Sequence, residues 1–531
     1  MKRTFNATGL CTPKRNYMVD ISDRVEQIIN EYVLPGKYFT MNRARQYGKT
    51  TTLYFLEERL KKCFLVLSLS FEAADEYFVS SETLVRGISM DIADCLRRQQ
   101  VDEKLIREWE KPVYESFSMR DFGARITQLC KSCGKEVVLI IDEVDKSSDN
   151  QIFLSFLGLL RSKYLDQLKG KDQTFLSVIL AGVYDIKNLK QKLHPGEESK
   201  YNSHWYVPIR AANRGRRPAL RRRRTIMAGS PWNIAADFVV DMSFSAKDIS
   251  SMLLQYEMDW DTGMDADNIS QLLYDYTSGY PFLVSRLCQI MAQNVTEASP
   301  KEERAKAWSA EAFQEAVREF LKKSNTLFDD MVKKLADYPK LREMIYSILF
   351  QGSRYAYEPD NELIRVGEMF GFLKERDGKV CVSNRIFEMK LYNLFLSEEE
   401  TDVKMFTAAD TEKNQFIRGG HLQMELVLQK FCEYFEDIYG DADDRFVEDN
   451  GRRIFLIFLK PIINGSGNYY IETRTRNMKR TDVIIDYKGV QNVLEMKICA
   501  PGALSITAYE DGKCIGQVRT PRSARGEKRY D

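Results

Sequence analysis

Short apolar runs alternate with longer amphipathic stretches through the first part of the chain. Four apolar runs, each bounded by polar or glycine residues, predict buried strands at 38–42, 64–70, 137–141 and 175–182. Apolar residues recur at helical spacing between and around them, over 16–36, 51–60, 82–131 and 150–168. Strands that alternate with helices are typical of a parallel α/β sheet, which is the fold class expected here.

The pattern changes to helix alone after residue 245. Helical spacing continues from 245 to about 323. Residues 340–396 then predict two helices, a hairpin at the Asp377-Gly378 turn and a third helix, an order that suits a small winged-helix-like module. A polar stretch over 397–414 is expected to be a linker.

The C-terminal block begins with a predicted helix at 421–439. Four apolar segments after it predict strands: 453–460, 469–473, 482–486 and 492–497. Residues 499–531 show no clear periodicity, so no element is expected there.

Candidate chemistry begins where the first predicted strand meets a helix. Gly48, Lys49 and Thr50 stand at that junction, with Thr51 next in the helix. A bound phosphate needs backbone N–H groups at a helix start, a lysine for the β- and γ-phosphates and a hydroxyl for Mg²⁺. These residues supply all three, so we expect a P-loop for ATP and Mg²⁺.

A second part of the same site is expected at the end of the third strand. The apolar run 137–141 leads directly into Asp142 and Glu143. Asp142 is expected to hold Mg²⁺, and Glu143 to orient and polarise the attacking water. The usual P-loop begins with glycine, whereas this chain has Arg43 at that position. The alternative is an exposed turn and an unrelated buried strand.

Arg286 is a further candidate for the nucleotide site. It lies one turn inside a helix that is predicted to start at Pro281, after a turn at Gly279. An arginine in an ATPase lid can reach the γ-phosphate, whereas an ordinary surface salt bridge is the other interpretation.

A second constellation lies near the C-terminus. Asp482 begins one predicted strand, and Glu495 and Lys497 share one face of the next because side chains alternate. Two carboxylates can hold Mg²⁺ and a lysine can assist a water, as in metal-dependent phosphodiesterases. Glu425, on the preceding helix, is a candidate additional ligand. The alternative is a solvated hairpin with charged outer positions.

Taken together, the two constellations resemble a bacterial family that joins an AAA-ATPase-like domain to a C-terminal PD-(D/E)XK nuclease-like domain. The matching segments are 42–53, 140–145, 279–286, Asp482 and Glu495-Met496-Lys497, and the likeness covers most of 15–498. Arginine at the first P-loop position is usual in that family, so the resemblance adds Arg43 to the nucleotide site. It also implies DNA or RNA as a partner and Asp482, Glu495 and Lys497 as catalytic residues.

The expected organisation has four parts. They are an ATPase core at 1–244, a helical lid at 245–335, a winged-helix-like module at 336–400 and a nuclease-like α/β domain at 410–531. Two segments depart from the family pattern. Residues 204–230 carry eight arginines and no acidic residue, which favours an insertion in a loop over a nucleic-acid-binding arm. The chain is atypical after residue 498, so the nuclease sheet is expected to be incomplete and its activity weak or absent.

Composition limits the remaining possibilities. Charge is balanced, with 78 Lys and Arg against 77 Asp and Glu, so no global field indicates nucleic acid or membrane. No apolar run is long enough to span a bilayer, so we expect a cytoplasmic protein without membrane contact. A homo-oligomer is one state that the sequence leaves open. The leading hypothesis is an ATPase coupled to a nuclease-like domain. A nucleotide-dependent switch, or a winged-helix DNA-binding regulator with an inactive nuclease remnant, is the alternative.

Overall fold

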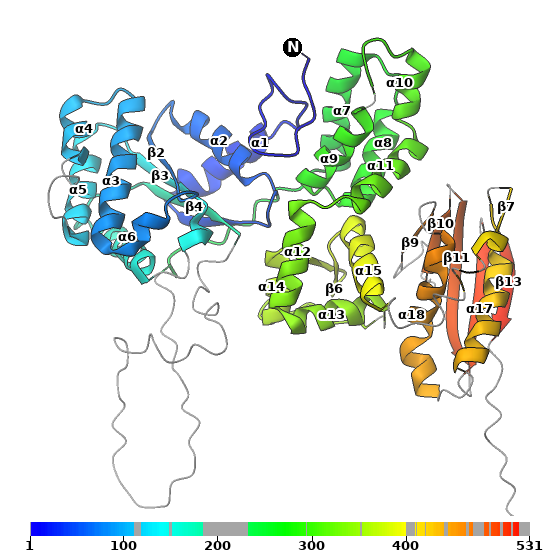
Figure 1. Ribbon diagram of the computed structural model, residues 1–531. Coiled ribbons are helices and arrows are strands. Elements are labelled where there is room, and N and C mark those ends of the chain that lie inside the picture. The colour runs from blue at the N-terminus through cyan, green and yellow to red at the C-terminus, as the bar shows by residue number, and fades with distance from the viewer. Residues whose placement is uncertain are drawn as a thin grey trace, which may run out of the picture. The chain divides into compact units, whose positions relative to one another are not determined.

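The computed structural model describes most of the chain up to residue 399 and separate stretches beyond it. The described residues are 2–110, 118–147, 151–183, 232–293, 295–350, 353–399, 409, 411, 413–419, 421–439, 444–463, 467–470, 483–487, 490–499, 503–510 and 513–519. The chain forms two compact units, and their elements are labelled in Figure 1. The first comprises Gly9–Thr12 and Asp20–Met242; the second comprises Met1–Thr8, Pro13–Val19 and Ser243–Asp531.

A parallel four-stranded sheet is the centre of the first unit. Its strands are β1 (Tyr38–Asn42), β2 (Leu65–Ser70), β3 (Val137–Asp142) and β4 (Ser177–Gly182), in the order β1-β4-β3-β2. All three neighbouring pairs are parallel. The predicted α/β class and the four predicted strands are therefore confirmed for this unit.

Helices cover both faces of this sheet. They are α1 (Ser22–Ile28), α2 (Lys49–Leu60), α3 (Ser81–Arg98), α4 (Glu103–Glu110), α5 (Met119–Ser132) and α6 (Gln151–Leu168). A π-helical turn (Ile29–Val33) continues α1, and short 3₁₀ turns lie at Asp75–Val79 and Val144–Ser147. In Figure 1, α3 to α6 lie on one side of the sheet, and α1 and α2 on the other.

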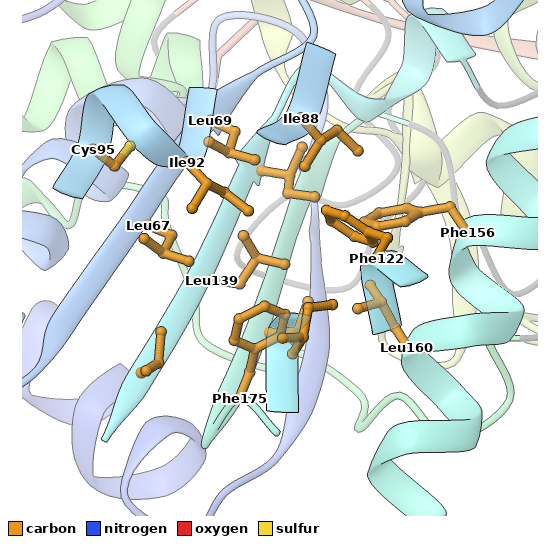
Figure 2. Packing of buried hydrophobic residues seen from close by; sticks show 14 of the residues in the cluster. Leu67, Leu69, Ile88, Ile92, Cys95, Phe122, Leu139, Phe156, Leu160 and Phe175 are labelled. Carbon is orange, nitrogen blue, oxygen red and sulfur yellow. The ribbon is translucent and has the colours of Figure 1, made fainter. Parts of the chain in front are cut away.

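One large apolar core joins the sheet to α3, α5 and α6. Leu67 and Leu139, from the strands, pack in this core with Ile92 of α3 (Figure 2). Phe122 of α5 and Phe156 of α6 belong to the same core. Each of these side chains is at most 2% exposed, so each contributes about 1.5–3 kcal/mol of burial. This core fixes the carboxyl ends of the strands, where the candidate site lies.

The segment that starts at Trp232 returns to the same sheet. Trp232 is fully buried and its Nε1 donates to Thr40 Oγ1 of β1 at 3.1 Å. The Ala236 amide donates to the Tyr38 carbonyl at 2.8 Å. Residues 184–231, which include the arginine-rich stretch 204–230, lie outside the described residues.

The second unit begins with helices, as expected for residues 245–323. They are α7 (Ala246–Trp260), α8 (Ala266–Thr277), α9 (Pro281–Ala292), α10 (Lys301–Ala307) and α11 (Ala310–Lys322). Phe5 and Tyr17 from the start of the chain pack against Tyr256 of α7, with ring centroids 5.2 and 5.1 Å away. The N-terminal residues are therefore part of this helical core.

The helices and hairpin expected for 340–396 follow, preceded by one more helix, while their winged-helix character remains a prediction. Its elements are α12 (Thr326–Asp337), α13 (Pro339–Phe350), α14 (Glu362–Met369), β5 (Leu373–Arg376), β6 (Lys379–Val382) and α15 (Arg385–Glu399). Asp377 and Gly378, with φ of 52° and 73°, form the tight turn between β5 and β6. Positive φ at both central residues is what a two-residue hairpin needs, so this turn was predictable from its Asp-Gly pair.

The described residues of the C-terminal part include a five-stranded antiparallel sheet and the helices α17 and α18. After a 3₁₀ turn (Lys413–Phe416) and the small hairpin of β7 (Ile417–Arg418) and β8 (His421–Leu422) come α17 (Met424–Tyr439) and α18 (Asp444–Ile463). The strands are β9 (Gly467–Tyr470), β10 (Val483–Tyr487), β11 (Val490–Cys499), β12 (Ala503–Glu510) and β13 (Lys513–Arg519). The sheet order is β13-β12-β11-β10-β9.

Two predictions for this part were wrong. The expected strand at 453–460 belongs to α18, where Phe455 and Phe458 pack on Phe431 of α17 with ring centroids 4.9 and 5.6 Å apart. A short continuous apolar run does not distinguish a buried strand from a buried helix. Residues 499–531 were expected to lack elements, yet they contain β12 and β13. The apolar, buried Ile506 and Ala508 alternate with the polar Ser505 and Thr507, a period-two pattern of residue type that the prediction overlooked.

Candidate nucleotide-binding site

The loop between β1 and α2 has the backbone geometry of a phosphate-binding turn. Gly48 immediately precedes α2 and adopts φ of 81°, in the left-handed region that favours glycine. The Thr52 amide donates to the Gly48 carbonyl at 2.9 Å, which starts the helix. The α2 N-terminus therefore lies at the carboxyl end of β1, where its free N–H groups and dipole favour an anion.

Lys49 is held inside this loop. Its Nζ donates to the Arg43 carbonyl at 2.8 Å and to the Ala44 carbonyl at 3.0 Å. Burial lowers the pKa of the Lys49 amine, and the carboxylates of Asp145, Asp142 and Glu143 oppose that shift. The ammonium is thus surrounded by acceptors in a partly desolvated site, where it can exchange carbonyl partners for phosphate oxygens.

The two predicted halves of the site meet at Thr50 and Asp142. The Thr50 Oγ1 donates to Asp142 Oδ2 at 3.3 Å, across 92 positions of sequence. Burial raises the pKa of Asp142, while the hydrogen bond from the Glu143 amide, 2.9 Å from Oδ1, and the charge of Lys49 lower it. A hydroxyl and a carboxylate at this separation are the oxygen donors that Mg²⁺ prefers, so these residues fit the metal.

Glu143 has an unusual backbone conformation. Its φ is 57°, a left-handed value that is uncommon for a non-glycine residue and costs of order 1 kcal/mol. The conformation follows directly after Asp142, at the end of β3. Such strain is concentrated at functional sites, so the observation is consistent with the role expected for Glu143.

Asp145 is a site residue that the sequence-based selection left out. Its carboxylate is the leading charged neighbour of Lys49, and its Oδ2 accepts a hydrogen bond from the Val183 amide at 2.5 Å. The signal available in the sequence was its position three residues after Asp142, at the end of an apolar strand. The structure places it on the 3₁₀ turn Val144–Ser147.

Arg43 links the P-loop to residues 238–240, which are distant in sequence. Its guanidinium donates to the carbonyls of Asn42 at 2.9 Å, Phe238 at 3.3 Å and Val240 at 2.8 Å, and lies 5.1 Å from the Phe238 ring centroid. Burial lowers the pKa of Arg43, and Tyr47 and Asp241 oppose the shift. These contacts indicate that Arg43 joins the P-loop to the segment before residue 243, so direct contact with the nucleotide remains only an expectation.

Two other expected nucleotide contacts have different surroundings. The Thr51 Oγ1 accepts a hydrogen bond from the Cys11 amide at 3.3 Å. Arg286 lies on α9 in the second unit, where its guanidinium donates to Gln289 Oε1. The part of both residues in nucleotide binding remains a prediction.

The candidate nuclease residues are described only in part. Asp482 lies outside the described residues, as does the side chain of Lys497. Glu495 is half-buried in β11, where it pairs with Thr507 of β12. In the described part of the chain, no cluster of three or more His, Cys, Asp or Glu residues could hold a metal. The convergence of Asp482, Glu495 and Lys497 therefore remains a prediction.

The expected addition of Glu425 to that set is not supported. Glu425, on α17, packs over Gly516 of β13, where an added Cβ would lie 3.5 Å from its Cγ. Gly516 pairs with Ala508, and Ala508 with the buried Leu494, so α17 covers the face that Leu494 shares. Because side chains alternate along a strand, Glu495 points to the opposite face.

Comparisons with known proteins identify the domain type of the N-terminal part of the chain. The family model of an AAA-like domain matches residues 12–186, so the N-terminal part of the chain contains an AAA-like domain. No curated protein matches the sequence. Similar solved structures include a Walker-type ATPase of Pyrococcus abyssi, with 13% identity, a TM-score of 0.45 and coverage of 73% of this chain and 99% of that chain.

Two other similar solved structures are those of a Cdc6p and an ORC1 protein. Cdc6p of Pyrobaculum aerophilum has 13% identity, a TM-score of 0.33 and coverage of 74% of this chain and 97% of its own. ORC1 of Aeropyrum pernix, solved in complex with DNA, has 12% identity, a TM-score of 0.31 and coverage of 72% of this chain and 94% of that chain. Among the described residues, none of the helices is both long and apolar enough to cross a membrane.

Proposed function

We propose that this protein binds ATP and hydrolyses it at the site formed by the β1–α2 loop and the end of β3. One observation carries the proposal. Thr50, at the start of α2, and Asp142, at the end of β3, are hydrogen-bonded at 3.3 Å, and Lys49 lies beside them with its charge favoured by three carboxylates. A turn and a strand that were unrelated would not bring these groups together.

Each residue then has a defined part in the reaction. Lys49 binds the β- and γ-phosphates, and the N–H groups at the start of α2 bind phosphate oxygens. Thr50 and Asp142 hold Mg²⁺, which when bound neutralises charge on the phosphates. Glu143 orients the attacking water and accepts its proton. The charge of Asp145 opposes the lowering of the Lys49 pKa by burial.

The test compares the parental chain with Lys49→Ala in calorimetric titrations with ATP and Mg²⁺. Truncation of a phosphate-binding lysine is expected to weaken ATP binding by at least about tenfold, because a charge-assisted hydrogen bond contributes about 1.5–3 kcal/mol. The fold is expected to be retained, since Lys49 is the first residue of α2 and lies outside the apolar core, although the thermal midpoint should fall somewhat because two hydrogen bonds to loop carbonyls are lost. Lys62→Ala, at an exposed position just after α2, is the matched control. Equal ATP affinity in the parental chain and Lys49→Ala would exclude this site.

Coupling to a nuclease-like activity on DNA or RNA is the second part of the proposal. It is supported by the position of Glu495 in a central strand, and by β12 and β13, which extend the sheet beyond the elements that the sequence predicted. The test is Mg²⁺-dependent cleavage of a DNA and RNA panel by the full chain, with Glu495→Ala as the inactive variant. Glu433→Ala, exposed on α17, is the control. Cleavage that survives Glu495→Ala would assign the activity elsewhere.

The winged-helix regulator is less well supported than the ATPase. The helix α15 has two basic residues, and both contact protein. Arg385 lies 4.3 Å from the Tyr276 ring centroid, and Lys390 Nζ donates to the Leu321 carbonyl at 3.4 Å. These side chains are therefore used to dock the module on the preceding helices. Assembly into a homo-oligomer would be detected by light scattering. A nucleotide-dependent switch without cleavage would be detected as a change in assembly when ATP is added.

A further inference from the structure

The chain leaves the first unit through a segment that has no regular secondary structure. Residues 237–242, the connecting segment, belong to neither a helix nor a strand, and the second unit resumes at Ser243. Buried and exposed side chains alternate along it. Phe238 and Val240 are at most 7% exposed, whereas Val239 between them is 73% exposed. One side of the connecting segment is therefore packed on the first unit, and side chains of other segments hold it there.

Tyr32 holds the start of the connecting segment. Its hydroxyl donates to the Asp237 carbonyl at 3.0 Å and accepts a hydrogen bond from the Val239 amide at 3.0 Å. Its ring centroid lies 5.5 Å from that of Phe238. Tyr32 belongs to the π-helical turn Ile29–Val33, and such turns are rare and frequently lie at functional sites. The irregular turn thus supplies the side chain that binds the backbone of this segment.

Arg43 holds the middle of the connecting segment from the P-loop. Its guanidinium donates to the Phe238 carbonyl at 3.3 Å and to the Val240 carbonyl at 2.8 Å. A guanidinium presents its donors in a fixed planar fork, so one side chain can bind two carbonyls of the same segment. Hydrogen bonds from a charged donor are also the stronger class. The connecting segment is therefore attached directly to the phosphate-binding loop.

The main chain of the same arginine contacts the nucleotide site. The Arg43 carbonyl accepts a hydrogen bond from Lys49 Nζ at 2.8 Å, and the Arg43 amide donates to the Gly182 carbonyl at 3.2 Å. A phosphate that binds Lys49 changes the surroundings of this carbonyl and fixes the loop in one conformation. The guanidinium on the same residue is then fixed as well, and with it the two carbonyls that it binds.

Thermodynamic coupling between the phosphate site and the connecting segment acts in both directions. If ATP binds more tightly when Arg43 is in this position, ATP must favour the attached form of the segment by the same factor. Coupling of this kind typically changes an equilibrium about 5–150-fold. A segment without helix or strand responds readily, because few backbone hydrogen bonds oppose its local opening.

We propose that the connecting segment responds to nucleotide: ATP bound at the P-loop fixes residues 237–242 through Arg43, and departure of the nucleotide releases them. The segment thereby carries the state of the ATP site to the point where the second unit resumes, at Ser243. This response rests on the ATP binding proposed above, and it names the route by which occupancy of the site is passed on.

The experiment measures amide hydrogen exchange of the full chain in Mg²⁺, with and without a saturating non-hydrolysable ATP analogue. Peptides that cover 237–242 are expected to exchange at least about fivefold more slowly when the analogue is bound. Peptides from α3 are the internal reference and should not change, because a gain in global stability alone would slow exchange there too. Equal slowing in both regions would overturn the proposal.

Arg43→Lys tests whether the fork is the connection. Lysine keeps the positive charge and an apolar stem but presents a single compact ammonium, so it cannot reproduce the paired hydrogen bonds to the segment. At a saturating analogue concentration, confirmed by calorimetry, the slowing at 237–242 is expected to disappear. Arg45→Lys, at an exposed position of the same loop, is the matched control and should keep the full response. A full response in Arg43→Lys would overturn the proposal.

Tyr32→Phe tests the coupling from the other direction. The change removes both hydrogen bonds of the hydroxyl while the ring remains, so exchange at Val239 should become faster without nucleotide. ATP affinity is then expected to fall about fivefold, because a looser segment disfavours the loop conformation that binds ATP. Tyr164→Phe, whose ring centroid lies 4.5 Å from that of Tyr38, is the control and should leave affinity unchanged. Faster exchange with unchanged ATP affinity would show that the segment and the site are not coupled.

Failure of this proposal is distinguishable from failure of the ATP site. Absence of ATP binding by the parental chain in calorimetry would overturn the proposed function and the response together. ATP binding without any change in the exchange of 237–242 would overturn the response alone and leave the ATP site in place.

Discussion

The carboxylate of Asp145 occupies the space that a side chain at Gly182 would fill. A Cβ on Gly182 would lie 2.6 Å from Asp145 Oδ1, closer than real Cβ contacts come. The same carboxylate accepts the Val183 amide and favours the charge of Lys49. The glycine at the end of β4 therefore allows the segment after β3 to approach the phosphate loop.

Glu143→Gln is expected to separate ATP binding from hydrolysis. The amide keeps the size of the side chain but cannot accept a proton from water, so the hydrolysis rate should fall about 10²–10⁴-fold while ATP still binds. Phosphate release under saturating ATP measures the first effect, and calorimetry the second. Glu72→Gln, at an exposed position after β2, is the control. Hydrolysis at the parental rate would mean that another residue orients the water.

Arg43→Ala is expected to destabilise the first unit and weaken ATP binding together. The change removes hydrogen bonds to Phe238 and Val240, and hydrogen bonds from a charged group contribute about 1.5–3 kcal/mol. Urea denaturation measures the free energy of unfolding. Arg45→Ala changes an exposed arginine of the same loop and should alter stability by less than about 0.5 kcal/mol. Equal stability of the two variants would show that the Arg43 contacts are not needed.

Gly279→Ala is expected to disrupt the start of α9. A Cβ there would lie 1.9 Å from the Phe244 carbonyl oxygen, and φ is +72°. The loss of stability should reach about 3 kcal/mol or more, because backbone must move and strain is added. Gly263→Ala has a similar φ of +76° but its nearest atom, Lys301 Cε, is 3.6 Å away, so only about 1–2 kcal/mol is expected. Similar midpoints in thermal unfolding would contradict the steric explanation.

Asp91 is expected to make stability depend on pH. Burial raises the pKa of Asp91 to about 6, the hydrogen bond from Tyr77 lowers it, Asp94 raises it and Arg98 lowers it. An unfolded aspartate titrates near 3.9, so between these values the folded chain holds a proton that the unfolded chain has lost. The group therefore costs stability progressively as pH rises from about 4 to about 6, with the full cost present above pH 6.

The measurement for Asp91 is urea denaturation of Asp91→Asn near pH 8 and near pH 4. The variant should be more stable than the parental chain at the higher pH, by about 1 kcal/mol, and nearly equal at the lower pH. Asp94→Asn, an exposed neighbour on α3, should show a smaller dependence. A difference that is larger at low pH would reverse the assigned sign.

The sequence predicted the first unit better than the C-terminal part for a physical reason. Strands buried on both faces, such as β3, are continuous apolar runs between polar residues, and glycine and lysine mark the turn before α2. The same apolar continuity misled the prediction for 453–460, where helix α18 is buried by α17 and the sheet. Local pattern alone does not reveal which surface an apolar run will meet.

Sequence prediction of the candidate site is limited in the same way, because contacts made through the tertiary fold are not visible in a local motif. Lys49, Thr50 and Asp142 follow from motif and spacing, because the chemistry of phosphate and Mg²⁺ dictates them. The partners of Arg43 lie about two hundred residues away in sequence, so its contacts with Phe238 and Val240 were not predictable from the loop. The separation of Glu425 from Glu495 depends on which face of the sheet α17 covers, a tertiary feature that strand alternation does not determine.

The two ends of the segment 184–231 are fixed by the same sheet. The Val183 amide is held by Asp145, and Trp232 by Thr40. The chain therefore enters and leaves this 48-residue segment at two points that are held in the first unit. Loop-closure entropy grows only with the logarithm of length, so removing the 27 residues 204–230 would change it by about 0.7 kcal/mol. Insertions and deletions can thus accumulate here during evolution with little consequence for folding of the ATPase core.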